Sequence, residues 1–287
     1  MDNSFTTLDY QMSPAEKLSI AENVAAFMLP RANVIIDRNL HKIARAKKYP
    51  YFLHKDIITP YYGTWHMVLT FFEKCSKTIG ISNVALDLYQ EYEKWESKNP
   101  SNDGYGMFHI IVNCGATGIR LDEFTPHMFN RIIERYDDEV DYMEFQERAM
   151  FMKKLTLNSL LAVKDEVKNA HGFEYREFVV DVPAGQLLGR RYKEDERYFC
   201  TTTFISKNEM KSSQFVQNDV HAKLIQFKKD NLDKYAIGIR DRDCDSQLQK
   251  YYGKVVADEI NRLLKTSDWK VRNSPAIRSI ASSLSNR

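Results

Sequence analysis

The sequence lacks the marks of a secreted, membrane-spanning or zinc-stabilised protein. Its four cysteines include no C-x-x-C pair and have no histidines at zinc spacing nearby. No apolar run approaches the roughly 20 residues that span a bilayer. The first residues form neither the basic nor the apolar region of a signal peptide. We therefore expect a cytoplasmic protein with reduced cysteines, no metal site, no cofactor and no membrane partner.

An excess of charge of one sign is also missing. The chain carries 41 Lys and Arg against 39 Asp and Glu, a formal net charge of +2. No global field therefore favours nucleic acid, and any basic binding surface must be local. Internal repeats and low-complexity tracts are absent as well. What is abundant is aromatic residues, with 16 Phe and 16 Tyr in 287 residues, enough to build a substantial core.

Helix and strand patterns alternate along the chain. Ser13-Pro-Ala-Glu16 is a capping box that starts a helix, and Pro30 is expected to end it. A second helix is predicted at about 31–48. The further expected elements are a hairpin at 55–62 and 64–73 around Gly63, a helix at 82–96, a hairpin at 107–113 and 118–124, helices at 125–136 and about 139–168, strands at 175–182, 186–192 and 197–205, a helix at 206–229, a short strand at 235–240 and a helix at 245–265.

These elements predict an α+β fold in which a mostly antiparallel sheet is flanked by helices, with helical segments at both ends of the chain. Residues 1–100 form N-terminal helices and a hairpin, 101–240 an α+β core, and 241–287 a C-terminal helix and tail. The same pattern also fits one large domain. The Ser-, Asn- and Arg-rich tail is expected to be mobile or to contact a protein partner.

The segment from Phe124 to Tyr136 contains the best chemical constellation of the chain. Thr125 can cap a helix, and Pro126 suits its first position. At about 100° per residue the helix has two faces. Its inward face is expected to bury Met128, Phe129, Ile132, Ile133 and Tyr136. Its outward face carries His127, Arg131, Glu134 and Arg135.

Those four polar side chains suit phosphate chemistry or ordinary solvation. A helix N-terminus beside His127 and Arg131 can hold a phosphate, while histidine moves a proton and arginine stabilises the charge on phosphorus. Glu134 would orient Arg131 or act as a general base, and Arg135 would bind a flanking phosphate. As a solvated helix face, the same residues would only form surface ion pairs.

A basic stripe on the helix at about 31–48 is the second candidate surface. Its members, Arg38, Lys42, Arg45 and Lys48, are spaced by four, three and three residues. Clustered cations of this kind bind the phosphates of a nucleic acid, or form a solvated helix face. His54, Asp56 and His66 are expected to approach one another across the first hairpin, where a metal site is a weaker alternative.

Thr125-Pro-His127, Arg131 and Glu134-Arg135, followed by the strand ending in Thr201-Thr-Thr-Phe-Ile205, resemble the helix-then-sheet core of RelE-like and BrnT-like toxin ribonucleases and related H-x-x-x-R-x-x-E-R domains. The resemblance covers about residues 119–206, less than a third of the chain. It implies an RNA-directed protein, a metal-independent ribonuclease of the toxin or defence type with catalytic His127, Arg131 and Glu134. The alternative is a non-catalytic interaction or assembly subunit, for example a structural component of a virus, a phage or another mobile element.

Overall fold

The structure is a computed structural model that describes residues 7–59, 61–72, 84–95, 98, 100–113, 118–157, 159–170 and 172–210. Its elements, in chain order, are α1 (Pro14–Ala44), β1 (Tyr51–Thr59), β2 (Gly63–Phe71), β3 (Val84–Lys94), η2 (Pro100–Asn102), β4 (Gly104–Asn113), β5 (Gly118–Phe124), α2 (Pro126–Arg135), η3 (Asp138–Tyr142), α3 (Phe145–Thr156), β6 (Leu160–Ala170), β7 (Phe173–Val182), β8 (Gly185–Tyr192), β9 (Tyr198–Ser206) and η4 (Lys207–Glu209).

The described strands form one nine-stranded sheet in the order β1-β2-β3-β4-β5-β9-β8-β7-β6. Strands β1 to β5 pair with their neighbours in antiparallel fashion. The pairing of β5 with β9 is parallel, with Leu121 opposite Tyr198 and Phe124 opposite Thr201. The predicted α+β class with a mostly antiparallel sheet is therefore confirmed for the part of the chain that the structure describes.

The chain divides into two compact units. The described residues of the first unit lie within 7–153, 162–179 and 187–204, and those of the second within 154–161, 180–186 and 205–210. In the second unit, Gln186 donates a hydrogen bond to Asp181 at 2.8 Å, and Ser206 and Glu209 form a capping box at η4. The predicted boundaries at 100 and 240 stay a prediction.

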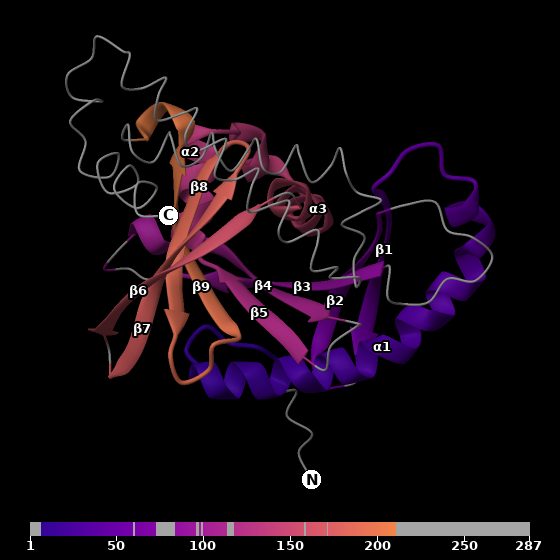
Figure 1. The fold of residues 1–287 in the computed structure, drawn as a ribbon, viewed down its shortest axis with the longest axis horizontal. Helices are drawn as coiled ribbons and strands as arrows, with labels where there is room; N and C mark the ends of the chain where they lie inside the picture. Colours follow the sequence, from indigo (N-terminus) through magenta and orange to yellow (C-terminus); the bar gives the residue numbers. More distant parts are fainter. Residues whose placement is uncertain are drawn as a thin grey trace, which may run out of the picture. The chain divides into compact units, whose positions relative to one another are not determined.

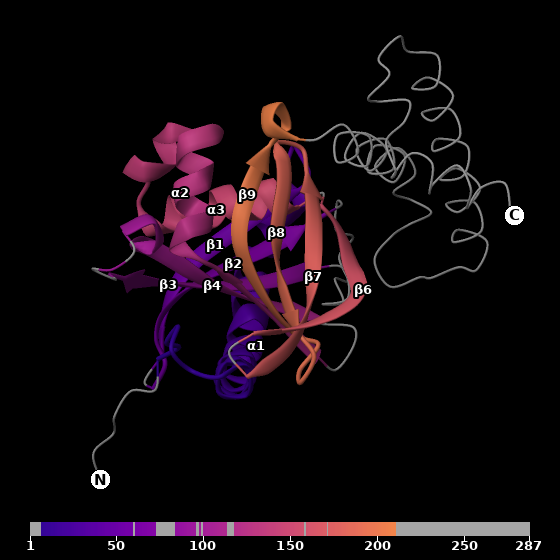
Figure 2. The ribbon, with the colours of Figure 1, turned by 90° about the vertical axis from the view of Figure 1, so that its left-hand side faces the viewer.

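Within the first unit, helices cover both faces of strands β1 to β5. α1 lies against one face, and α2 and α3 lie over the other (Figures 1 and 2). Alternate strand residues contribute to a core beneath α1, among them Trp65, Leu86, Phe108 and Leu121. No helix among the described residues is long and apolar enough to cross a membrane.

α1 is a single helix of 31 residues, so the expectation of two helices separated at Pro30 is wrong. Its start is as predicted, because Ser13 and Glu16 form the capping box. A proline inside a helix removes one backbone hydrogen bond. Here Pro30 and Ala26, whose carbonyl loses that bond, are both exposed, so water can bind the carbonyl and the helix continues.

One predicted helix and the second half of another are replaced by strands. Residues 84–94 form β3, and residues 160–170, the second half of the expected helix at 139–168, form β6. In β3, Leu86 and Leu88 face the core under α1, whereas Asp87 and Tyr89 alternate with them. A strand that is covered on both sides carries apolar residues on both faces. The apolar residues of 84–94 therefore also match the spacing of a helix, which is why the sequence predicted one. The segment forms a strand because its backbone pairs with β2 on one side and β4 on the other.

The segment after β5 forms the predicted helix. α2 begins after its N-cap Thr125, whose hydroxyl accepts a hydrogen bond from Met128 N. Ile132 is fully buried, whereas Ile133 is only partly buried and Tyr136 is 51% exposed. The expected burial is therefore wrong for Tyr136, which follows the helix as its C-cap.

The elements expected beyond residue 210, namely most of the helix at 206–229, the strand at 235–240, the helix at 245–265 and the tail, lie outside the described residues.

The burial along α2 leads to a stability prediction. Ile132→Ala removes a fully buried side chain and should lower the free energy of unfolding by about 2–5 kcal/mol. Ile133→Ala is the matched control on the same helix and should cost clearly less. Urea denaturation followed by circular dichroism measures both. Equal losses in the two variants would contradict the packing of α2.

Candidate functional site

The predicted catalytic residues do lie on the open face of α2, but most of them already have partners. His127 Nδ1 is 3.1 Å from the carbonyl oxygen of Ser101 in η2, which orients the imidazole ring. Arg131 Nη1 lies 2.6 Å from Glu134 Oε2, so the predicted pairing of these two is present. Arg135 donates a hydrogen bond to the carbonyl of Phe204.

The surroundings of α2 are unfavourable for a phosphate. η3 follows the helix directly and carries Asp138, Glu139 and Asp141. Three carboxylates close to Arg131 and Arg135 would repel an anion at the distances over which surface charges act. In addition, the basic stripe is on α1, on the opposite face of strands β1 to β5 (Figures 1 and 2). The structure therefore does not join His127 and the stripe into one footprint.

The basic stripe itself is largely as predicted. Arg38, Lys42 and Arg45 are exposed on α1, and Lys48 is exposed beyond it. The helix ends at Ala44 with Arg45 as its C-cap, so the expected extension to residue 48 is wrong. None of the four forms an ion pair with a carboxylate among the described residues.

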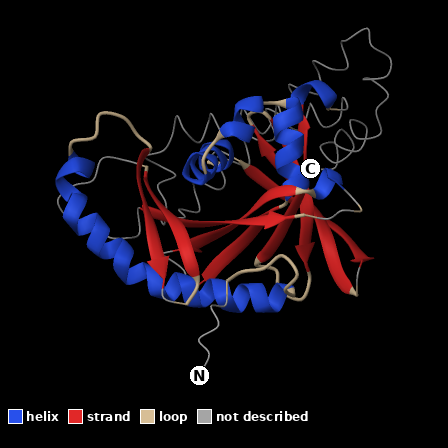
Figure 3. Cartoon of the chain, turned by 180° about the vertical axis from the view of Figure 1, so that it is seen from behind, coloured by secondary structure: helices blue, strands red, loops and turns tan. Residues whose placement is uncertain are grey.

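The position of the stripe follows from the length of α1. Lys17, near the start of the helix, forms an ion pair with Glu123 on β5 at 2.7 Å. From Lys17 to Ala44 the helix is about 40 Å long at 1.5 Å per residue. Strands β5 and β1 are four positions apart, about 19 Å across the strands. The second half of α1 therefore runs past β1, the end strand of the sheet (Figures 1 and 3). We call residues 30–44 the overhang.

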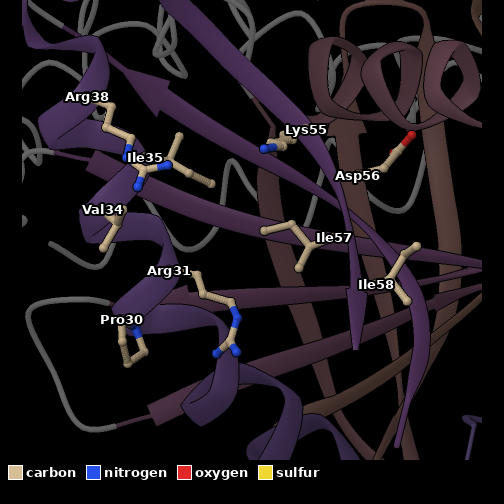
Figure 4. A pocket seen from close by; sticks show the side chains of 9 residues that line it. All are labelled: Pro30, Arg31, Val34, Ile35, Arg38, Lys55, Asp56, Ile57 and Ile58. Atoms are coloured by element: carbon tan, nitrogen blue, oxygen red, sulfur yellow. The ribbon is translucent and has the colours of Figure 1, made fainter. Parts of the chain in front are cut away.

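A groove of about 530 Å³ separates the overhang from β1. In Figure 4, Lys55 and Ile57 on β1 point toward α1, whereas Asp56 and Ile58 point the other way. The side chains that line it are mainly apolar or cationic: Pro30, Arg31, Val34, Ile35, Arg38, Lys55, Ile57 and Ile58, together with Asp56.

The groove combines an apolar floor with positive charge. Val34 is 47% exposed on the overhang, and Ile35 and Ile57 beside it in the lining are partly exposed. Asp56, the one acid of the lining, is occupied elsewhere, because its carboxylate accepts hydrogen bonds from His66 and from Gln146 of α3. An exposed surface of this composition can bind a ligand that is both apolar and anionic.

A row of polar side chains crosses strands β1 to β5, and the sequence predicted only its first part, the approach of Asp56 and His66. The strand register puts Asp56, His66, Tyr89, His109 and Asp122 directly opposite one another on β1 to β5. His66 Nδ1 is 2.6 Å from Asp56 Oδ1, so the expected approach of these two is confirmed. The rings of Tyr89 and His109 stack with centroids 4.3 Å apart.

Asp87 connects this row to α3. Its carboxylate binds His109 Nε2 at 2.9 Å and the ammonium of Lys153. Burial by itself raises the pKa of Asp87, but Lys153 and His109 outweigh it, so the pKa lies below its ordinary value. Burial and the neighbouring carboxylates of Asp87 and Asp122 raise the pKa of Tyr89.

The row holds α3 against the sheet rather than offering a reactive surface. Asp87, His109 and Lys153 are 1%, 3% and 7% exposed, so a macromolecular substrate does not reach them. The described residues contain no group of three or more His, Cys, Asp or Glu arranged to hold a metal ion. Of the surfaces considered, the groove beside the overhang is the accessible one with unpaired charge.

Comparison with known proteins adds no functional assignment. No family model matches the chain, and neither a curated protein nor a solved structure is significantly similar to it. The resemblance to toxin ribonucleases stays a prediction, and functional arguments depend on the chemistry of the residues themselves.

The buried pair of Asp87 and Lys153 predicts a strong effect on stability. Asp87→Asn leaves the Lys153 ammonium without its counter-ion and should lower the free energy of unfolding by about 3–5 kcal/mol. Adding Lys153→Met removes the stranded charge and should recover part of the loss. Asp165→Asn, an exposed acid on β6, is the control and should change stability by less than about 0.5 kcal/mol.

The same pair predicts a pH dependence. The pKa of Asp87 in the folded state is lowered from 3.8, so its carboxylate stabilises the fold above that pH, and the contribution is lost as the pH falls through the folded-state pKa. The difference in unfolding free energy between the wild type and Asp87→Asn should be constant at pH 5–7 and shrink below about pH 3.8. Urea titrations across this range measure it, and a difference that grows on acidification would contradict the assignment.

Catalysis at α2 is tested separately. If His127 and Arg131 cleave RNA, His127→Ala should lower the rate by about 100- to 10,000-fold. Arg131→Lys should also lower it, because lysine keeps the charge but loses the two-pronged contact with phosphate. His41→Ala, an exposed histidine on α1, is the control. Labelled RNA is incubated with each protein, with and without EDTA, and intact RNA in every wild-type reaction would refute the ribonuclease prediction.

Proposed function

We propose that this protein is a binding module for an anionic macromolecule and that it acts through the overhang and the groove beside it. The observation that carries the proposal is the group of exposed cations on the overhang, Arg38 and Lys42 with the C-cap Arg45, which have no carboxylate partner among the described residues. Cations at helical spacings of three and four residues repel one another, and a bound anion removes this repulsion.

Cations elsewhere on the first unit differ from those of the overhang because many of them are already neutralised. Lys164 and Lys168 both bind Glu177, and Lys193 binds Glu174. Arg197 contacts Asp195 and Glu22. A partner that approaches the overhang therefore finds free positive charge, which supports binding there rather than on the β6–β7 surface.

The proposal retains part of the predicted RNA-directed function and part of its alternative. RNA is an anionic macromolecule that could bind the overhang, and an acidic protein is another. The ribonuclease part has weaker support, because Arg131 and Arg135 have partners and η3 adds three carboxylates next to them.

Binding is tested by removing charge from the overhang. The triple variant Arg38→Ala, Lys42→Ala and Arg45→Ala should weaken the binding of oligouridine or of polyglutamate in a fluorescence anisotropy titration. For oligouridine, each lost phosphate contact should reduce the slope of log K against log salt by about 0.7. The control variant changes Lys164, Lys168 and Lys193 to alanine, removes the same charge and should bind as the wild type does. Unchanged binding of both probes by the overhang variant would refute the proposal.

A further inference from the structure

We infer that the anionic partner is an extended acidic segment of another protein. It adds, as a further strand, to the edge of β1 that no described strand pairs with, and places its side chains in the groove beside the overhang. The inference rests on the proposed function, because it uses the same cations. It adds the chemical class of the partner and the way in which its backbone is held.

The edge of β1 is suited to pairing with another strand. β1 is the first strand in the sheet order, and among the described strands it pairs with β2 alone. Its nine residues pair without interruption, from Tyr51 opposite Phe71 to Thr59 opposite Gly63. The strand therefore has no bulge that would turn its outer edge away, and its outward N–H and C=O groups form a template for another backbone.

The overhang lies where the side chains of an added strand would project. The helical face of Val24 and Met28 stays buried along the overhang through Ala32, Ile36 and Ile43. At the border of that face, Val34 and Ile35 line the groove. These side chains, with Ile57 of β1, form an apolar floor. Because successive side chains of a strand point to opposite faces, every second residue of the added segment would contact this floor. Those positions favour aliphatic residues.

The cations beside the floor indicate which other residues the added segment should carry in the groove. Arg31, Arg38 and Lys55 line the groove from both sides. Arg31 is stacked on the ring of Phe27 and donates a hydrogen bond to its carbonyl, so its position is fixed by the helix. Neither Arg38 nor Lys55 has a carboxylate partner among the described residues. Glutamate or aspartate in the segment can supply the missing carboxylates.

A polypeptide fits this groove better than single-stranded RNA does. Proteins that bind single-stranded nucleic acids stack its bases on aromatic rings, whereas the lining of the groove is aliphatic and cationic. The unpaired edge of β1 offers alternating donors and acceptors at the spacing of a β-strand, which a second polypeptide backbone matches. Binding of RNA in place of a peptide is an outcome that the experiment can detect.

The test uses the full chain and a nine-residue peptide that matches the length of β1. Its odd-numbered residues, which face the groove, are alternately valine and glutamate, and its even-numbered residues are threonine. Isothermal titration calorimetry measures its affinity. A second peptide has the same side chains but N-methyl groups on alternate amides, which block the hydrogen bonds of one strand edge. It should bind at least about tenfold more weakly, and the Arg38→Glu variant should bind the unmodified peptide at least about tenfold more weakly. Lys193→Glu is the charge-matched control and should bind normally.

The position of the peptide is read from backbone amide hydrogen exchange. The unmodified peptide should slow exchange in β1, at residues 51–59, and leave exchange in β4 unchanged. Equal affinity of the N-methylated peptide, or no change in β1, would overturn strand addition while leaving anion binding in place. Binding of oligouridine that depends on Arg38, without binding of the peptide, would replace the inferred partner by RNA. Failure of oligouridine, polyglutamate and the peptide alike would refute the proposed function as well.

Discussion

The buried ion pair between Lys17 and Glu123 is the interaction on which the geometry of the described part depends. Taking both charges out of water is costly unless hydrogen bonds compensate. Here Lys17 also donates to the Tyr10 carbonyl and to the Tyr198 hydroxyl, while Tyr92 and Tyr198 both donate to Glu123. The cluster joins the start of α1 to strands β3, β5 and β9. Losing one charge would leave the other buried and unpaired, so the position of α1 on the sheet is strongly constrained.

That constraint explains why the first unit has an accessible binding surface. A helix held at β5 and longer than the width of five strands must extend past β1. There Ala32, Ile36 and Ile43 stay buried, whereas Val34 at the border of the apolar face is exposed. Val34 and Ile35 line the groove at the border of the buried face, and Arg38 and Lys42 follow Val34 at intervals of four residues. The aliphatic floor and the free cations of the groove are thus two consequences of one anchored helix.

Charge is also divided between the two faces of the first unit. Arg38, Lys42 and Lys55, which have no carboxylate partner among the described residues, lie on the overhang and β1, whereas η3 carries Asp138, Glu139 and Asp141 next to α2. The net charge of +2 gives no sign of this division, because it sums 41 cationic and 39 acidic residues over the whole chain. An anionic partner is attracted to one side and repelled from the other, which gives binding an orientation as well as a site.

Local signals in the sequence predicted those elements whose ends are marked by specific residues. The capping box at Ser13 and the Thr125-Pro126 start of α2 were recognised because caps and prolines act within one helical turn. The strand pairs around β4–β5 and in β7–β9 were recognised from short apolar runs between turns. β3 was misread as a helix, so the burial of Asp87 beneath α3 was not foreseen.

Sequence alone thus determined the fold class, the helix starts and the existence of a basic stripe, because each depends on residues close together in the chain. Tertiary structure decided what those features do. The continuation of α1 through Pro30, the burial of His109 beside Asp87, and the groove between Val34 and Ile57 all depend on contacts between distant segments. The hydrophobic periodicity of the sequence does not show which strand lies at the edge of the sheet. It also does not show how far α1 extends past that strand. Only the pairing of the strands and the anchoring of Lys17 supply that information.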